Sequence, residues 1–202
     1  SCRIEEAIGI IENVISAINE YNLLLWIASL DLRKAFDRIQ YDALFTALRE
    51  QGLDHAEIAL LLDMYSCQSG SVGDSKTFQI ERAIKQWDNL SSLLFNAATG
   101  SIFRFWKAQL DGHGWIIRNG SERLTNVRFA DDMILFTKSL DELTEMLEML
   151  KEELFQAGLE LHADKPKILA KKNPENVRLV DIGNVFFQVL QQDDAHRYLG
   201  RV

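Results

Sequence analysis

Two adjacent aspartates, Asp131 and Asp132, lie between two apolar segments of strand length. Val127 and Phe129 precede the pair and the apolar run 133–136 follows it, which predicts a β-hairpin with the two carboxylates at its tip. Neighbouring like charges beside an apolar core repel each other, and a divalent cation usually compensates them. Carboxylate oxygens on a tight turn suit Mg²⁺. The alternative is a solvated turn, because aspartate is common in turns.

A third aspartate, Asp31, ends the most apolar strand-like run of the chain, residues 23–30. A carboxylate at that point is expected at the edge of a sheet, facing a cleft; a strand-terminating or helix-capping role is the alternative. Phosphoryl transfer by two metal ions needs carboxylates that converge in space around ions roughly 4 Å apart. Asp31 and the Asp131–Asp132 pair meet this requirement if their strands pair, which the sequence alone does not show.

The segments that would position these aspartates alternate between helices and strands. The spacing of apolar residues, together with capping and stop signals, predicts helices at about 1–20, 41–51, 55–65, 89–107 and 139–157. Short apolar or alternating runs predict strands at about 23–30, 71–72, 77–80, 115–118, 124–129, 133–136, 168–169, 177–180 and 185–190. Because these elements follow no regular βαβ period, the pattern favours the α+β class.

Composition is that of an ordinary globular protein. The 202 residues are 47% hydrophobic and include two cysteines, Cys2 and Cys67, whose spacing matches no disulfide or metal motif. Such cysteine usage favours a reducing, intracellular compartment, without distinguishing the nucleus from the cytoplasm. The longest apolar run, 23–30, is too short to span a bilayer, and no signal peptide is visible. The chain begins with Ser1 rather than Met, so we expect a fragment.

The net charge of −8, considered alone, argues against nucleic acid as a partner. Its distribution weakens that objection, because residues 139–160 carry −6 of it and leave the remaining chain close to neutral. We expect this acidic excess on the solvated face of one helix. Basic residues form three clusters that suit nucleic acid, with simple surface decoration as the alternative. They are Arg33, Lys34 and Arg38; Arg118, Arg123 and Arg128; and Lys165, Lys167, Lys171 and Lys172.

Residues 30–37 read Leu-Asp-Leu-Arg-Lys-Ala-Phe-Asp, and residues 129–132 read Phe-Ala-Asp-Asp, with Asp131 100 positions after Asp31. These motifs, in this order, resemble the palm of a reverse transcriptase, and most of all that of the non-LTR (LINE-type) retrotransposon enzymes. Further segments resemble that family in its own order: the helical stretch 44–71, the glutamine motif 85–96, the lysine motif 158–165 and the start of the primer-grip segment at 197–200. The likeness therefore runs along nearly the whole chain.

The resemblance implies one partial reverse transcriptase domain over residues 1–202. Its fold would be an α+β palm, an antiparallel sheet of the RRM type with packed helices, with part of the fingers and without the thumb. The implied parts are a palm core at about 24–37 and 88–170, fingers and palm elements at about 1–30 and 41–86, and the start of the primer-grip region at 177–202. The fingers segment whose arginine grips the triphosphate is expected before residue 1.

The resemblance also implies catalytic roles for individual side chains. Asp31, Asp131 and Asp132 would bind two Mg²⁺ ions, for which Mn²⁺ could substitute, and Asp131 is the more central of the adjacent pair. Lys165 would act as the acid beside the pyrophosphate leaving group, with a solvated lysine as the alternative. Asp37 is expected to be structural.

The nucleotide and the primer would contact other residues. Phe36 would be the steric gate that rejects a 2′-hydroxyl, with a core aromatic residue as the alternative. Gln86 would contact the nucleotide or the template, with an exposed glutamine as the alternative. The primer end would be placed by Tyr198, Leu199 and Gly200.

The implied reaction is attack of a primer 3′-hydroxyl on the α-phosphate of a deoxynucleoside triphosphate (dNTP), templated by RNA. The implied partners are an RNA template, a DNA primer and a dNTP, with no membrane. An endonuclease or another element domain could be fused outside these residues.

Departures from the family pattern affect the nucleotide end of the site. The glutamine motif normally reads Gln-Gly-Asp-Pro-Leu-Ser-Pro, whereas this chain has Trp87, Asn89 and Ser92 in place of the glycine and the two prolines. An indole disfavours close approach of the backbone to substrate, and losing the prolines loosens the start of the helix. His162 and Pro166 depart from the lysine motif. These changes put nucleotide binding in doubt, as expected of a decaying element copy. Because part of the fingers and the thumb are expected to be missing, we expect little or no polymerase activity from these residues alone.

Two other functions are compatible with the sequence. A non-catalytic remnant of a reverse transcriptase would bind RNA or protein; Trp87 and the weak basic footprint favour it, whereas the intact Asp31, Asp131 and Asp132 oppose it. Another two-metal palm enzyme, such as a nucleotidyl cyclase, would share the architecture but not this order of motifs.

Overall fold

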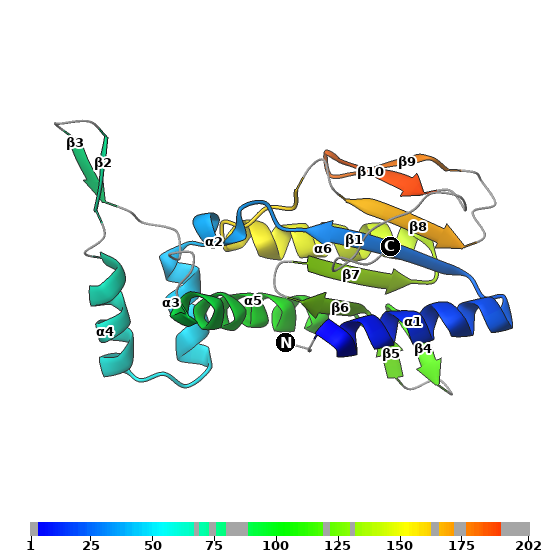
Figure 1. Cartoon of the computed structure of the whole chain (residues 1–202), viewed down its shortest axis with the longest axis horizontal. Coiled ribbons are helices and arrows are strands. Elements are labelled where there is room, and N and C mark those ends of the chain that lie inside the picture. Colours follow the sequence, from blue (N-terminus) through cyan, green and yellow to red (C-terminus); the bar gives the residue numbers. More distant parts are fainter. Residues whose placement is uncertain are drawn as a thin grey trace. The chain divides into compact units, whose positions relative to one another are not determined.

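The computed structural model of the chain describes residues 4–66, 69–72, 76–79, 89–118, 122–129, 132–162, 166–171 and 177–190 (Figure 1). The chain separates into two compact units. Unit 1 comprises residues 1–33, 106–152 and 160–202, and unit 2 comprises residues 34–105 and 153–159.

Unit 1 is built on a six-stranded sheet with the strand order β6-β7-β1-β8-β10-β9. Its strands are β1 (Leu25–Asp31), β6 (Asn126–Phe129), β7 (Asp132–Thr137), β8 (Lys167–Lys171), β9 (Leu179–Ile182) and β10 (Val185–Leu190). All neighbouring strands are antiparallel except β8 and β10, which are parallel. The parallel pair arises because the β9–β10 hairpin returns β10 to the side of β8, in the same direction (Figure 1).

One face of the sheet is covered by α1 (Ile4–Tyr21) and by a hairpin of β4 (Trp115–Arg118) and β5 (Glu122–Leu124). Strand side chains alternate between the two faces, so Ile27, Ile134 and Phe136 all point toward α1. Ala7, Val14 and Ile18 of α1 and Trp115 of the hairpin complete this buried cluster. The amphipathic spacing of α1 therefore serves to cover half of the sheet.

The opposite face is equally apolar, since Trp26, Ala28 and Leu30 of β1 are all buried. Helix α6 (Leu140–Gln156) carries a stripe of side chains that are 0% exposed, namely Leu143, Met146, Leu147 and Leu150. A sheet and an amphipathic helix each bury one face by packing on one another, and α6 runs along the sheet in Figure 1. Because both faces are covered, β7 is buried at every position from Met133 to Thr137.

Unit 2 consists mainly of helices. They are α2 (Ala35–Arg38), α3 (Tyr41–Glu50), α4 (His55–Ser66) and the greater part of α5 (Asn89–Gln109), with a separate hairpin of β2 (Ser69–Val72) and β3 (Lys76–Gln79). Leu44, Phe45, Leu48, Ile58, Leu94, Phe95 and Ala98 are buried in this unit. The side-chain amide of Gln51 donates to the carbonyl oxygens of Ala97, at 2.8 Å, and Ala47, at 3.1 Å, and so ties the end of α3 to α5.

Several element ends differ from the predicted ones by one or two residues, for example those of β9, which spans Leu179–Ile182 rather than 177–180, and two further differences concern whole elements. Strand β1 begins at Leu25 rather than residue 23. The short helix α2 was not predicted, because four residues show no periodicity. A single predicted strand from residue 124 is split at Thr125, since β5 pairs with β4 whereas β6 pairs with β7. Among the described residues, no helix is long and apolar enough to cross a membrane.

Glu142 links the start of α6 to a neighbouring loop. The predicted capping box forms in part, because the backbone N–H of Glu142 donates to Ser139 Oγ at 3.2 Å. The Glu142 carboxylate accepts the backbone N–H groups of Lys138, at 2.8 Å, and Gly114, at 2.7 Å. Gly114 has a φ of 96°, which other residues rarely adopt.

We expect Glu142→Ala to lower the free energy of unfolding by about 1.5–3 kcal/mol, the scale of hydrogen bonds to charged groups. The matched control is Glu148→Ala, which removes an exposed glutamate of the same helix. Urea denaturation of both variants measures the difference. An equal, small loss in the two variants would contradict the role of Glu142.

Candidate active site

Asp31 and Asp132 lie directly opposite each other, as the terminal pair of the β1–β7 ladder. Opposed residues of an antiparallel pair share a face of the sheet, with Cβ atoms about 4.5–5.5 Å apart. Both aspartates are half-buried and lie on the same face as Ile27 and Ile134. The structure therefore pairs the two strands whose pairing the sequence left open, and brings two of the predicted carboxylates together.

The chain beyond Asp31 is held by the segment 160–162. The backbone N–H of His162 donates to the carbonyl oxygen of Asp31 at 2.8 Å, and that of Arg33 donates to Glu160 at 2.9 Å. An isolated bridge joins Leu32 to Leu161 between these two bonds. The start of the predicted lysine motif is thus hydrogen-bonded to the first aspartate motif.

The predicted catalytic hairpin is formed by β6 and β7. Phe129 and Asp132 are its last pair. Of the other predicted site residues, all except Phe36 lie outside the described part of the chain: Asp131, Gln86, Lys165, Tyr198, Leu199 and Gly200.

Phe36 lies on α2, in unit 2, and is half-buried. Its ring stacks on the ring of Phe95 from α5, with the centroids 4.4 Å apart and an interplanar angle of 27°. Phe95 is 1% exposed. No pattern in the sequence pointed to this contact, because it joins a one-turn helix to a distant helix.

Positive charge lies on the opposite side of the β6–β7 hairpin from Asp132. Arg128 pairs with Met133, one position along the ladder from Asp132, so its side chain leaves the other face of the sheet. Burial lowers the pKa of Arg128 to about 10, which leaves it charged at neutral pH. Burial also lowers the pKa of Lys107, and the nearby charge of Arg128 lowers it further. Arg128 is therefore not simply a solvent-exposed surface residue, which was the alternative for its cluster.

The donor chemistry of the aspartate pair fits a divalent cation. Two carboxylates at the open end of a strand pair supply hard oxygen ligands, which suit Mg²⁺ and Mn²⁺. Within the described ranges, no group of three or more His, Cys, Asp and Glu side chains is placed to hold a metal ion. The predicted third ligand, Asp131, is outside those ranges.

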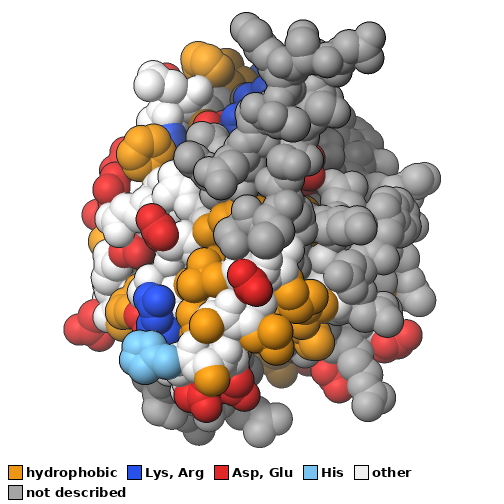
Figure 2. Space-filling view, turned by 90° about the vertical axis from the view of Figure 1, so that its left-hand side faces the viewer, with side chains coloured by type: hydrophobic (Ala, Val, Ile, Leu, Met, Phe, Trp, Pro, Cys, Tyr) orange, Lys and Arg blue, Asp and Glu red, His pale blue; other side chains and the backbone are white. Residues whose placement is uncertain are grey.

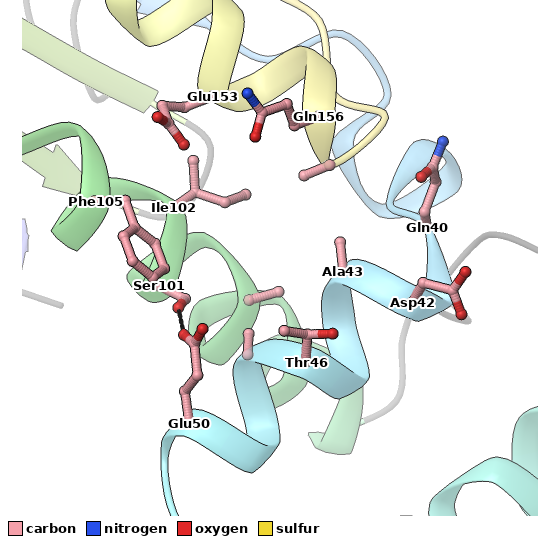
Figure 3. A pocket seen from close by; sticks show the side chains of 13 residues that line it. Gln40, Asp42, Ala43, Thr46, Glu50, Ser101, Ile102, Phe105, Glu153 and Gln156 are labelled. Atoms are coloured by element: carbon pink, nitrogen blue, oxygen red, sulfur yellow. Dashed lines mark hydrogen bonds between the residues drawn. The ribbon is translucent and has the colours of Figure 1, made fainter.

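A pocket of about 300 Å³ lies within unit 2, between α3, α5 and the end of α6 (Figure 3). Its lining includes the carboxylates of Asp42, Glu50 and Glu153, and Glu50 accepts a hydrogen bond from Ser101. None of the residues that line it, all of them described, is a lysine or arginine. On the face drawn in Figure 2, too, the described side chains are mainly hydrophobic and acidic. Because such surfaces repel phosphate, we do not place the nucleotide in this pocket.

The family model described as "Reverse transcriptase (RNA-dependent DNA polymerase)" matches residues 3–201. The chain belongs to the reverse transcriptase family. The match covers both aspartate motifs and the segments between and after them, and confirms the resemblance that the order of the motifs indicated.

Curated relatives of this reverse transcriptase chain are polyproteins of R2 retrotransposable elements. The "Retrovirus-related Pol polyprotein from type-1 retrotransposable element R2" of Nasonia vitripennis is 28% identical over 190 residues, covering 88% of this chain and 18% of the relative. The type-2 R2DM polyprotein of Drosophila melanogaster is 26% identical over 186 residues, covering 87% of this chain and 17% of the relative. The non-LTR type predicted from the motifs is therefore confirmed, and the chain spans about a fifth of the length of these relatives.

Solved structures of telomerases share the fold. Telomerase from Candida albicans, in complex with a TWJ fragment of telomeric RNA, aligns with a TM-score of 0.65 at 15% identity, over 90% of this chain and 32% of that chain. Apo telomerase from Candida tropicalis aligns with a TM-score of 0.62 at 13% identity, over 87% of this chain and 33% of that chain. This likeness confirms the predicted α+β palm of a reverse transcriptase.

Proposed function

We propose that this reverse transcriptase domain transfers nucleotides from dNTPs to a primer 3′-hydroxyl on an RNA template, through a two-metal site at the ends of β1 and β7. The observation that carries the proposal is the direct opposition of Asp31 and Asp132, in a chain of this family. Two directly opposed carboxylates repel each other, and a divalent cation between them would offset that repulsion.

Asp31 and Asp132, together with Asp131, would hold two Mg²⁺ ions, and Mn²⁺ would substitute for them. The chemistry that the bound ions supply is stabilisation of the negative charge on the attacking and leaving oxygens. In the reaction the primer oxygen forms a bond to the α-phosphorus, and the bond from that phosphorus to pyrophosphate breaks. The 3′-hydroxyl proton leaves to solvent, and Lys165 donates a proton to the departing pyrophosphate.

The remaining residues bind and position the substrates. Phe36 excludes nucleotides that carry a 2′-hydroxyl, and Gln86 contacts the nucleotide or the template. The residues 198–200 place the primer end. An RNA template and a DNA primer are the proposed partners; the RNA in the Candida albicans telomerase structure supports nucleic acid as the ligand of this fold. The palm core then comprises about 24–37 and 88–170, and an endonuclease or another domain would be fused elsewhere.

The test is primer extension on an RNA template, with Trp87 and with Trp87→Gly. The chain is assayed by itself and after it has been joined to a fingers segment and a thumb from the R2 relatives. Because Trp87 replaces the glycine of the family motif, we expect weak or no incorporation by the natural chain and recovery with Trp87→Gly.

The outcomes separate the candidate functions. Incorporation that depends on Asp132 supports a polymerase, and recovery only with Trp87→Gly indicates a damaged copy. Absence of incorporation in every form would refute the polymerase and favour a non-catalytic remnant, which Trp87 also favours.

Phe36→Val is expected to weaken the discrimination against ribonucleotides by about 10–100-fold, the range over which a pocket wall separates substrates that differ by one small group. The ratio of kcat/KM for a dNTP and for the matching ribonucleotide measures the effect. The control is Phe105→Val, which alters an exposed phenylalanine of α5. A ratio that stays constant in Phe36→Val would rule out the gate.

A further inference from the structure

Phe95 is the neighbour on which the ring of Phe36 rests. The two rings are nearly parallel, with centroids 4.4 Å apart and an angle of 27° between their planes. Stacked aromatic pairs in this distance range attract each other beyond the apolar area that they bury. Phe95 is 1% exposed, whereas Phe36 is half-buried, so one ring is fixed in the core and the other lies against it.

The backbone that carries Phe36 offers little support of its own. Helix α2 has four residues, and the residue before it, Lys34, adopts a left-handed conformation with φ 46° and ψ 47°. A helix this short is not stable by itself, because its few hydrogen bonds do not offset the cost of nucleation. The position of the Phe36 ring therefore depends on what it packs against.

The backbone that carries Phe95 is, by contrast, well anchored. Phe95 lies within α5, next to the buried Leu94, and its carbonyl oxygen accepts a hydrogen bond from Thr99 Oγ1 at 2.8 Å. Thr99 is 0% exposed, and Ala98 is 1% exposed. A side chain in such a close-packed setting does not yield to a small displacement of its neighbour.

We propose that Phe95 is a positioning residue that fixes the ring of Phe36 and thereby sets the discrimination between deoxyribonucleotides and ribonucleotides. The proposal rests on the proposed function, in which Phe36 is the steric gate. The Phe36 ring can exclude a 2′-hydroxyl only if the ring itself cannot be displaced, because displacements of about 1 Å at a reacting site change rates up to 100-fold. Phe95 prevents this displacement because its ring occupies the space against which the Phe36 ring would move.

The experiment introduces Phe95→Leu, Phe95→Tyr and Phe103→Leu into the Trp87→Gly form joined to a fingers segment and a thumb. Each variant is compared with that parent form, using a dNTP and the matching ribonucleotide as probes. Phe95→Leu should reduce the ratio of the two kcat/KM values by about tenfold, mostly by admitting the ribonucleotide. Phe95→Tyr keeps the ring and should keep the ratio. Phe103 is a matched control, a phenylalanine of the same helix that is 6% exposed. Phe103→Leu should lower stability comparably and leave the ratio unchanged.

The outcomes distinguish this proposal from the function on which it rests. If Phe36→Val lowers the ratio of the two kcat/KM values and Phe95→Leu does not, Phe95 has no positioning role, and Phe36 remains the proposed steric gate. If neither variant changes the ratio, the gate itself is wrong, and the role of Phe95 is overturned with it.

A second measurement applies to any form that incorporates no nucleotide. With a fluorine label on the Phe36 ring, the ¹⁹F signal should shift toward the averaged, unfolded position in Phe95→Leu and not in Phe103→Leu. An unchanged signal in Phe95→Leu would overturn the proposal.

Discussion

In the Trp87→Gly form joined to a fingers segment and a thumb, Asp132→Asn is expected to abolish RNA-templated primer extension. In the chain by itself, the same substitution is expected to make the metal-free protein more stable. The loss of activity follows from the proposed metal site, because removing a carboxylate that would bind the ions removes charge stabilisation worth several kcal/mol, or roughly 10³-fold in rate. Asp31→Asn should behave in the same way, since Asp31 is the directly opposed partner. Primer extension with Mg²⁺, and again with Mn²⁺, measures the loss.

The gain in stability follows from the register. Like charges directly opposite each other on paired strands cost about 0.2–1 kcal/mol, and asparagine removes one of the two charges. Urea denaturation without metal should therefore show a higher free energy of unfolding in either variant. The control is Asp181→Asn, which replaces an exposed aspartate of β9 that pairs with Phe186. A lower free energy of unfolding in both Asp31→Asn and Asp132→Asn would contradict the idea that these two carboxylates repel each other in the metal-free protein.

Trp106→Ala is expected to have the largest effect on folding, lowering the free energy of unfolding by about 3–5 kcal/mol. Trp106 is 0% exposed and is the largest fully buried side chain among the residues that the structure describes. Its indole N–H donates to the carbonyl oxygen of Met146 at 3.0 Å, and so ties the end of α5 to α6 within unit 1. Truncation leaves a cavity and also removes the donor for a buried carbonyl group.

Two further variants separate the cavity from the hydrogen bond. Trp106→Phe keeps most of the ring volume and loses the donor, so it should cost about 1–3 kcal/mol. Phe105→Ala, at a position 54% exposed, should cost far less than Trp106→Ala. Urea denaturation, with hydrogen exchange at β7 as a local readout, measures these differences. Equal losses in Phe105→Ala and Trp106→Ala would contradict the packing described for unit 1.

Local sequence patterns predicted an element well where apolar residues recur along one face of that element. The apolar spacing of α1 and the capping box before α6 indicated both helices, because these signals are contained within one element. The hairpin at Asp132 was likewise predicted from the apolar runs on either side of it. Pairing between distant strands was not predictable, because register depends on which surfaces the whole fold buries.

The candidate site shows the same division. Its residue types were evident from the spacing of two motifs, but the opposition of Asp31 and Asp132 became evident only from the ladder between β1 and β7. The stacking of Phe36 on Phe95 had no sequence signal at all, since either ring alone reads as an ordinary core residue. The roles proposed for Gln86 and Lys165 rest on the order of the family motifs, which carries information that local geometry does not.

The most direct test of the proposed metal site measures Mn²⁺ binding. The electron paramagnetic resonance signal of the free ion monitors the binding. This measurement needs neither a primer nor a nucleotide. The unaltered chain should bind Mn²⁺, and Asp31→Asn or Asp132→Asn should weaken binding by about 100-fold, the scale on which ligand charge tunes cation affinity. Asp181→Asn should bind as the unaltered chain does. Equal binding by all four proteins, or none by the unaltered chain, would contradict a metal site at Asp31 and Asp132.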